Sequence, residues 1–487
     1  MKENITMKVI KFGGSSLADA KQIKKAAEII CDDRERRIVV VSAPGKRYSQ
    51  DRKVTDLLIE LACDCLEGRD CVRALEGVIS RYRQIAEELG IRSSIADEIE
   101  GDIKHRISSA HLPKKKFLDL IKAAGEDNCA RLIAAYLCQK GENAEYVNPK
   151  DAGLMLCEEE GHVKILPSSY EALSKLKERK SLMVFPGFFG YSPEGEVITF
   201  PRGGSDITGS ILAAAVNAAL YENFTDVDSV FAASPSVIRN PAPIRTMSYE
   251  EMRELSGAGF GVLHEEAVAP AWRKGIPINI RNTNNPKEPG TMIVSGKCGR
   301  NHPGIVGIAV EKGFVTMHVT KSLMKYETGF ERNLLGILDE EGLTYDYLTI
   351  GIDNVSFTAR ASETNAEKRE RIVKRIYTEL KADKIEIENN RAVIMLIGQD
   401  IARYAEAAGK ACDALTAEKI SVKMVNQNTA EGSILFEVEE KEADLAVKVL
   451  YRSFFQKKER ICLNRRNSNS RDFRALCTKT HRGTVEG

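Results

Sequence analysis

Two glycine pairs, each beside a cation and each followed by a helical pattern, are the features of this sequence best suited to chemistry. The first lies in KFGGSS at residues 11–16, and the second in RGGSD at residues 202–206. Paired glycines let backbone amides approach a ligand closely, and a helix N-terminus presents unpaired N–H groups. Lys11 and Arg202 add positive charge, and an arginine can bind a carboxylate or phosphate bidentately. The pattern predicts a site for more than one anionic group, although each turn alone could be structural, with Ser205 or Asp206 as an ordinary helix cap.

Acidic residues stand at two further places. Asp226 and Asp228 follow an apolar run and point to the same side if the segment is extended, so they could serve a ribose or a magnesium shell. They could equally be turn formers. Glu126 follows Gly125 at the predicted start of a helix over residues 127–139, where its charge would also complement the helix dipole. Taken alone, these residues indicate a site for several anionic groups and do not identify its ligands.

Alternating strand and helix patterns must position these residues. Short β-branched or apolar runs predict strands at residues 8–10, 38–41, 182–185 and 276–280. Helical periodicity occurs at residues 20–31, 206–220 and 249–255, and in a long charged excursion over residues 55–110. This alternation predicts an α/β domain with a parallel sheet covered on both faces by helices. A Pro- and Gly-rich segment at residues 284–304 predicts the end of that domain.

The segment beyond this linker contains a weak internal repeat with a period of about 78 residues. Val315 begins a run that is echoed at Val393, and Val355 begins one that is echoed at Ile434. Each copy predicts a strand, a helix, a strand ending in an irregular loop, and another strand. Such a unit is too small to bury both faces of its sheet, so we expect the copies to pack on each other or on a second chain.

Composition bounds the function. A chain of 487 residues is expected to hold about three domains at about 150 residues each. With 29% charged and 43% hydrophobic residues it is neither collagen-like, nor largely disordered, nor membrane-spanning. The net charge of +1 provides no broad field for nucleic acid or anionic lipid, so we expect a small-molecule ligand and neither of those partners.

The cysteines and the N-terminus predict a cytoplasmic protein. The eleven cysteines form no C-x-x-C pair and no zinc-type spacing with histidine, so we expect reduced thiols and no protein-held metal. The first 14 residues are too charged for a signal peptide. The longest apolar run, residues 211–220, is too short to span a bilayer core of about 30 Å.

Ten short motifs occur in a specific order along the chain. They are KFGGSS from residue 11, SAP from 42, VTDLL from 54, AAGED around 126, PGFFG from 186, RGGSD from 202, TDVDSVFAASP from 225, MSYEE from 247, VLH from 262 and NTNNPKEPGTMI from 282. In this order they closely resemble the aspartokinase family, over about residues 7–456.

The resemblance implies a domain organisation. Residues 1–300 would form a three-layer αβα amino acid kinase domain with a mainly parallel sheet. Residues 305–388 and 389–456 would form two regulatory ACT domains, which are α+β units of the ferredoxin-like type. Residues 457–487 hold nine Lys or Arg against three Asp or Glu. We expect a flexible solvated end there rather than a nucleic-acid arm.

The resemblance also implies an activity. Members transfer the γ-phosphoryl of ATP, used with Mg²⁺, to the β-carboxylate of L-aspartate. The product, 4-phospho-L-aspartate, leads towards lysine, threonine and methionine. Lys11 would stabilise the transferred phosphoryl group, and Asp206 would orient Lys11 or complete the substrate pocket. Residues implied along ATP are Lys11, Gly13, Gly14, Ser15, Thr225, Asp226 and Phe231. Residues implied around aspartate are Ser42, Thr55, Glu126 at the ammonium, Arg202 at a carboxylate, Gly203, Gly204 and Ser205.

Two departures from the family pattern fall near the nucleotide. Many aspartokinases have Asp-Pro-Arg where this chain has SPS at residues 234–236, and Gly-Ala-Lys where it has GFG at residues 259–261. Ser236 and Gly261 thus replace an arginine and a lysine, and Arg239 or Lys274 could compensate. Two alternatives stay open here. One is a catalytically silent amino acid sensor, and the other is a kinase for another amino acid.

The ACT resemblance further implies an amino acid effector, lysine or threonine or both. It would bind at an interface near residues 321–329 and 352–356, which could equally be ordinary turns and edges. Inhibition would act by a shift between two domain arrangements. Exposed strand edges in the small repeats predict a homodimer or larger homo-oligomer.

Overall fold

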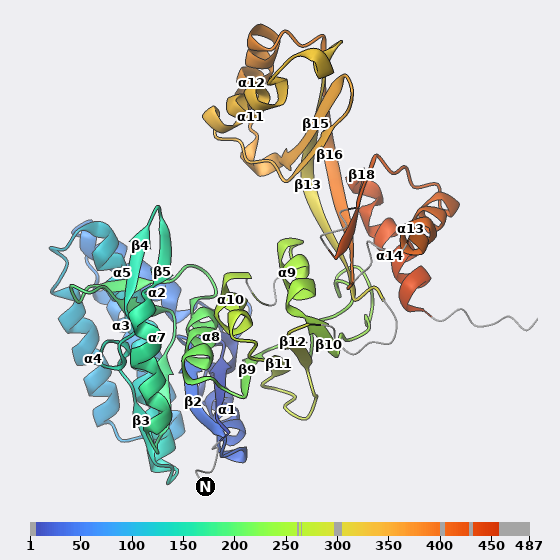
Figure 1. The fold of residues 1–487 in the computed structure, drawn as a ribbon. Coiled ribbons are helices and arrows are strands. Elements are labelled where there is room, and N and C mark those ends of the chain that lie inside the picture. Colours follow the sequence, from blue (N-terminus) through green and yellow to red (C-terminus); the bar gives the residue numbers. More distant parts are fainter. Residues whose placement is uncertain are drawn as a thin grey trace, which may run out of the picture.

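The computed structural model has an α/β part, blue to yellow-green in Figure 1, and a strand-rich part, yellow to red. The structure describes residues 6–260, 263, 265–296, 304–399, 405–427 and 432–456. The predicted basic tail at 457–487 and the departure at Gly261 lie outside these residues. None of the helices in the described ranges is long and apolar enough to cross a membrane.

An eight-stranded sheet forms the centre of the α/β part, in the order β10-β12-β11-β9-β1-β2-β6-β3. Its strands are β1 (Lys8–Phe12), β2 (Arg36–Val41), β3 (Ala144–Tyr146), β6 (Leu182–Pro186), β9 (Leu220–Thr225), β10 (Thr246–Ser248), β11 (Ile278–Asn282) and β12 (Thr291–Val294). Only the β11–β12 pair is antiparallel. Two hairpins flank the sheet, β4 (Leu156–Glu159) with β5 (His162–Ile165) and β7 (Phe189–Tyr191) with β8 (Val197–Thr199). The predicted mainly parallel sheet is confirmed.

Helices cover both faces of this sheet and make three layers. Ile10 and Val39 face one core, which is closed by α1 (Ala20–Asp32), α2 (Val54–Leu66), α3 (Val72–Leu89), α4 (Ser94–Ile107) and α5 (Lys114–Gln139). Val9 and Val40 point the opposite way, into a core closed by α7 (Pro167–Ser174), α8 (Gly204–Val216), α9 (Tyr249–Gly257) and α10 (Glu265–Arg273). A short α6 (Pro149–Ala152) follows β3. Because successive strand residues alternate between faces, an apolar run is buried on both sides.

One predicted helix start is wrong, and another is confirmed. The helix containing Glu126 begins at Lys114 and not near residue 127, so Glu126 lies inside α5. The helix continues through Gly125. A glycine is needed at this position because a Cβ there would lie 2.8 Å from the Ala43 Cβ. After KFGGSS the chain forms a 3-10 turn, η1 (Gly14–Leu17), and α1 begins at Ala20, as predicted. Asp19 caps α1 by accepting a hydrogen bond from the Gln22 amide.

The strand-rich part is one six-stranded antiparallel sheet, in the order β14-β15-β13-β16-β18-β17. Its strands are β13 (Gly307–Thr320), β14 (Tyr347–Ile350), β15 (Asn354–Arg360), β16 (Lys384–Ile397), β17 (Met424–Gln427) and β18 (Ser433–Glu439). Its helices are α11 (Phe330–Glu340), α12 (Ala366–Glu379), α13 (Ala405–Ala417) and α14 (Ala443–Phe455). The internal repeat is confirmed, because β13, α11, β14 and β15 of one copy correspond to β16, α13, β17 and β18 of the other.

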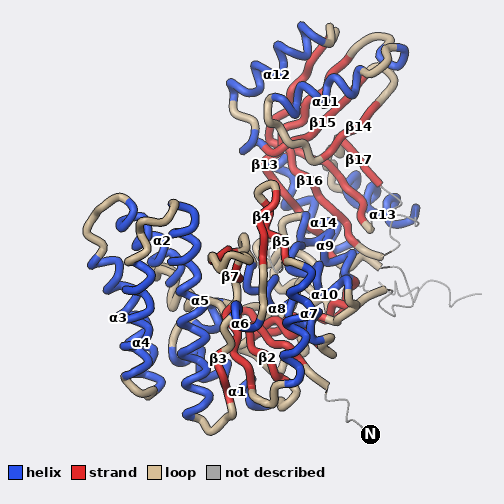
Figure 2. Tube along the Cα trace, turned by 60° about the vertical axis from the view of Figure 1, so that its left-hand side comes forward, coloured by secondary structure: helices blue, strands red, loops and turns tan. Residues whose placement is uncertain are grey.

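The two copies pack on each other by sharing their longest strands, which Figure 2 shows running away from the α/β part towards α11 and α12. The first half of β13 pairs with the second half of β16 beside β18, and their other halves pair beside β15. The predicted division between residues 388 and 389 therefore falls within β16. Gly313 (φ 85°) and Asn390 (φ 57°) lie where the β13–β16 register shifts, and such bulges bend a strand pair.

The two copies have different cores. Met317, Phe330 and Phe357 belong to a core confined to the first copy. Ile394 and Phe436 of the second copy instead join the core that contains α8, α9 and α10 of the α/β part. The second copy is thus built onto the α/β part, and the first copy is held mainly by β13 and β16.

Candidate active site

Lys11 lies near the carboxyl end of β1, between neighbours β2 and β9, where open α/β sheets bind ligands. Its side chain is buried, with an exposed fraction of 7% for the residue. The Lys11 Nζ lies 2.5 Å from Asp206 Oδ1 and 3.5 Å from Asn223 Oδ1. Asn223 Nδ2 donates to the same Asp206 oxygen over 2.7 Å. Two side chains, Asp206 from α8 and Asn223 from β9, thus hold the ammonium group of Lys11 in place.

The sequence predicted Lys11 and Asp206 but missed Asn223. Asn223 pairs in register with Lys11 across β1 and β9. An amide within the strand LYENFT was the available signal, since a buried amide requires hydrogen-bond partners.

The first glycine turn is fixed by β9 and by the loop after β2. The Gly13 amide donates to Phe224 O over 3.1 Å, so β9 already engages it. Gly14 permits a close approach, since a Cβ there would lie 2.9 Å from Ala43 O, and Gly14 O accepts from the Gly45 amide over 2.9 Å. The amides of Gly14 and exposed Ser15 begin η1, where helix geometry supplies no intrahelical acceptor.

The second glycine turn differs from its predicted form. Gly203 (φ 78°) is the N-cap of α8, so neither Ser205 nor Asp206 caps the helix, and Asp206 is available to Lys11. Gly204 and Ser205 are buried in the first turn of α8. Arg202 is exposed and lines a polar cavity of about 680 Å³ that also includes Lys122, rather than joining the contacts of Lys11.

Glu126 reaches the loop beside the first glycine turn from α5. The carboxylate is buried, and its Oε1 accepts from the Ala43 amide over 3.0 Å. Its Oε2 is also buried and has no hydrogen-bond donor among the described residues. Burial raises the pKa of the Glu126 carboxyl to about 7. An unsatisfied buried carboxylate oxygen suits a ligand that carries a donor.

Ser42 and Thr55 belong to the same neighbourhood and are half-buried. Ser42 directly precedes the residue that Glu126 contacts, and its amide donates to Phe12 O over 3.2 Å. Thr55 lies in the first turn of α2, which is tied to the same loop by the Val54 amide donating to Pro44 O over 3.0 Å. The structure therefore gathers the predicted residues Ser42, Thr55 and Glu126 around one loop.

The predicted nucleotide residues continue from the end of β9. Thr225 ends the strand, and its hydroxyl lies 3.2 Å from a carboxylate oxygen of exposed Asp226. Asp228 accepts hydrogen bonds from Asn282 and Asn285, so its carboxylate holds neighbouring segments of the chain together.

Phe231 lines a cavity of about 600 Å³. Its walls in the α/β part include Ser229, Ser236 and Phe260, and Val310, Lys312 and Asp444 of the strand-rich part complete it. Ser236 bonds to Ser234 through their hydroxyls, 2.7 Å apart. Arg239 and Lys274 are exposed and do not line this cavity.

No group of three or more His, Cys, Asp or Glu side chains with metal-binding geometry occurs in the part of the chain that is described. The segments predicted for an effector carry exposed apolar side chains. Tyr326 and Ile352 are 82% and 70% exposed, and Leu323 and Ile350 are also exposed. Ile350 ends the edge strand β14 and Ile352 follows it, and Leu323 and Tyr326 follow β13.

Comparisons with known proteins agree with this architecture. Residues 6–282 match the amino acid kinase family, and residues 394–454 match an ACT domain. Aspartokinase 3 of Bacillus subtilis is 47% identical over 449 residues, which cover 92% of this chain and 99% of that protein.

Solved structures give the same result. The aspartate kinase of Clostridium acetobutylicum is 37% identical with a TM-score of 0.83, covering 92% of this chain and all of the other. E. coli aspartokinase III has the same fold, with a TM-score of 0.71 at 22% identity. The match covers 92% of this chain and all of the other. From the kinase-family match over more than half of its length and the identity to a full-length relative, this chain belongs to the aspartokinase family.

Proposed function

We propose that this protein is an aspartate kinase that transfers the γ-phosphoryl of ATP to the β-carboxylate of L-aspartate, forming 4-phospho-L-aspartate and ADP. The observation that carries the proposal is the buried ammonium group of Lys11, held by Asp206 and Asn223 between two glycine turns. Family membership supports the choice of substrate.

The chemistry needs positioning more than proton transfer. A carboxylate oxygen of aspartate attacks the γ-phosphorus, a new P–O bond forms, and the bond to the β-phosphate oxygen breaks as ADP leaves. The attacking carboxylate is already ionised at neutral pH, so no general base is required. Lys11 supplies a preorganised positive charge for the transferring group, and Asp206 and Asn223 keep it aimed.

The other predicted residues take supporting roles in this proposal. The amides of Gly14 and Ser15 bind phosphate oxygens, and Gly13 shapes the turn. Glu126 binds the aspartate ammonium group through its unpaired oxygen, and Arg202 binds a carboxylate from the rim. The remaining contacts to aspartate come from Ser42, Thr55, Gly203, Gly204 and Ser205.

Thr225, Asp226 and Phe231 lie along the nucleotide. We assign Mg²⁺ mainly to the phosphates of ATP, because Mg²⁺ keeps several of its waters and is commonly bound through substrate phosphates.

Regulation and assembly are part of the same proposal. In sequence terms, residues 1–300 are the kinase domain, and residues 305–388 and 389–456 are ACT domains that share β13 and β16. Lysine or threonine, or both, would bind near residues 321–329 and 352–356. The exposed apolar residues there and the free edge of β14 support a homodimer or larger assembly. E. coli aspartokinase III, which shares the fold, has been solved with lysine and aspartate.

A coupled ADP-release assay tests the reaction. With ATP and Mg²⁺ present, L-aspartate should support turnover and L-glutamate should not. Initial rates should fall on adding millimolar lysine, threonine or their mixture. Turnover with glutamate alone, or with no amino acid, would reject the proposed substrate. Unchanged rates with all three effector solutions would reject only the proposed effectors.

A further inference from the structure

The cavity around Phe231 is completed by the regulatory part of the molecule. Val310, Lys312 and Asp444 form one wall of it, and residues of the kinase domain form the rest. Val310 and Lys312 lie on β13, and Asp444 lies in the first turn of α14. A ligand in this cavity would therefore touch both parts.

The charge on the walls is uneven. Among the described lining residues, Lys312 is the only cation and Asp444 the only anion. The lining residues from the kinase domain are serines, apolar residues and a glycine, none of which carries a charge. The Ser236 hydroxyl is already bonded to that of Ser234. A nucleotide carries several negative charges, so its phosphates need positive charge or amides wherever they are bound. Among the described residues that line this cavity, Lys312 is the one that can supply such a charge.

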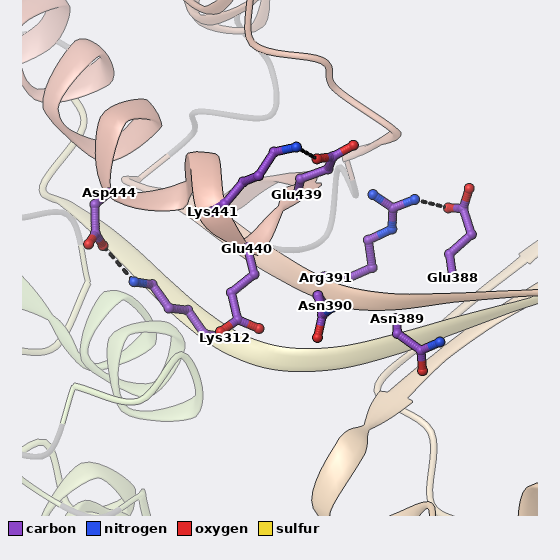
Figure 3. Close-up of a pocket in the computed structure, with 9 residues that line it drawn as sticks. All are labelled: Lys312, Glu388, Asn389, Asn390, Arg391, Glu439, Glu440, Lys441 and Asp444. Carbon is purple, nitrogen blue, oxygen red and sulfur yellow. Dashed lines mark ion pairs between the residues drawn. The ribbon is translucent and has the colours of Figure 1, made fainter. Parts of the chain in front are cut away.

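Lys312 is held near the cavity by a weak partner. Its Nζ lies 2.8 Å from Asp444 Oδ1. Figure 3 marks this ion pair with a dashed line. The two side chains are 40% and 51% exposed, and ion pairs in such surroundings contribute little to stability. The following amide, that of Gly313, donates to Glu440 Oε2 over 3.2 Å and fixes the backbone. Lys312 can therefore exchange Asp444 for another anion without a backbone change.

We propose that Lys312 is a nucleotide-binding residue supplied by the regulatory strand β13, and that Asp444 holds it when no nucleotide is bound and competes with a nucleotide phosphate for it. This inference rests on the proposed function, in which Phe231 lies along the nucleotide. It identifies a cation that neither Arg239 nor Lys274 provides.

The same two residues link the nucleotide to the junction of the repeats. Lys312 and Asp444 also line a second cavity, of about 740 Å³, together with Glu388, Arg391 and Glu440 (Figure 3). This cavity adjoins the bulge at Gly313 and Asn390, where the two repeats meet. A change in the bend there would move Lys312 relative to the nucleotide.

Nucleotide affinity measured by calorimetry without aspartate tests the inference. Lys312→Gln should weaken ADP binding about tenfold, since it removes a charge-assisted contact, and Lys312→Arg should restore most of it. Asp444→Asn should tighten ADP binding, because the competing anion is gone. Adenosine, which lacks phosphate, should bind equally to all variants. The KM for ATP should follow the ADP affinities, and the KM for aspartate should stay unchanged.

Lys441→Gln is the matched control. Lys441 lies 2.6 Å from Glu439 and lines only the second cavity, so its loss should leave ADP affinity unchanged. Equal ADP affinities for wild type and Lys312→Gln would overturn the inference. So would Asp444→Asn weakening ADP binding as much as Lys312→Gln, because the pair would then be structural. Wild type that binds ADP through Lys312 without phosphorylating aspartate would reject the proposed function alone.

Discussion

The two ends of the proposed site are built differently. At the aspartate end, Lys11, Asn223 and Glu126 are buried and bonded within the kinase domain, on β1, β9 and α5. At the proposed nucleotide end, Asp226 and Ser236 are exposed, and Val310, Lys312 and Asp444 of the strand-rich part line the cavity around Phe231. One end is fixed by a single packed domain, and the other depends on how two parts of the molecule meet.

This difference teaches where regulation can act. Charges that stabilise a transition state must be preorganised, and burial inside one domain provides that. Affinity for ATP can vary without disturbing those charges. A shift of the repeats should therefore change the KM for ATP more than kcat. The predictions below test this division, first at the buried aspartate end around Lys11 and Glu126, and then at the open nucleotide end around Phe231.

Lys11→Ala should have the largest effect. It removes the charge that acts on the transferring phosphoryl group, so kcat should fall at least about 10²-fold. Lys11→Arg should not restore activity, because the longer fork does not fit between Asp206 and Asn223 at a buried position. The ADP-release assay measures both variants, with circular dichroism to confirm folding. A loss of less than tenfold would contradict the role assigned to Lys11.

Glu126→Gln should act on aspartate rather than ATP. The uncharged side-chain amide of the variant cannot form an ion pair with the ammonium group of L-aspartate. The KM for aspartate should therefore rise at least about tenfold, while the KM for ATP stays unchanged. In the wild type, the Glu126 pKa of about 7 means that the carboxylate is mostly protonated at pH 6. The aspartate KM should therefore rise as pH falls from 8 to 6, and the variant should lack this rise. A parallel pH dependence in both proteins would refute the assignment.

The same carboxyl makes a prediction about stability. Burial raises the pKa of Glu126 above its ordinary value, so the folded state binds more protons than the unfolded state between that value and about 7. Stability of the ligand-free protein should fall as pH rises through this window. Glu126→Gln should remove that loss and stabilise the protein at pH 8 by up to about 3 kcal/mol, with little gain at pH 4. Melting temperatures of both proteins at the two pH values check this.

Local patterns in the sequence predicted much of the fold. The β-branched runs found β1, β2, β6 and β11, because buried parallel strands need apolar residues on both faces. The helix over residues 249–255 appears as α9, with the Ser248 and Glu251 capping box that such starts favour. The repeat offset found the corresponding elements of the two ACT copies. The strands and the capped helix depend on residues close together in the chain, and the repeat is found by comparing two such local patterns about 78 residues apart.

Features that depend on distant contacts could not be predicted in the same way. The predicted helix start beside Glu126 is wrong because α5 continues through Gly125, which packs against Ala43, more than 80 positions earlier. Asn223 becomes a site residue only through its register with Lys11. Lys312 belongs to no glycine motif, and only the meeting of β13 with the kinase domain brings it to Phe231.

Phe231→Ala should sharpen the contrast at the open end. An aromatic wall beside a nucleotide contributes packing area, so its removal should raise the KM for ATP by about five- to twentyfold. The KM for aspartate and kcat should change less than twofold, because the Lys11 contacts stay intact. Steady-state kinetics with each substrate varied in turn gives these values. A fall in kcat comparable to the rise in KM would mean that the two ends are not independent.

Ser433→Ala should have the smallest effect and tests how the repeats reach the nucleotide end. Ser433 Oγ donates to Glu254 Oε2 over 3.0 Å, and the amide of Gln399 donates to Glu251 over 2.8 Å, so the second repeat is bonded to α9. The chain after α9, at Ala258 and Gly259, lines the cavity around Phe231.

Losing one such hydrogen bond costs about 1 kcal/mol, which limits the change in the KM for ATP to about two- to fivefold. Thr378→Ala is the matched control, because the Thr378 hydroxyl bonds only within α12 of the first repeat and its loss should leave that KM unchanged. An altered aspartate KM in Ser433→Ala would instead place the influence of the repeats at the buried end. The second repeat shares its core with both α8, which carries Asp206, and α9, which leads to the cavity around Phe231. Which of the two KM values changes in Ser433→Ala therefore shows which end of the site the repeats influence.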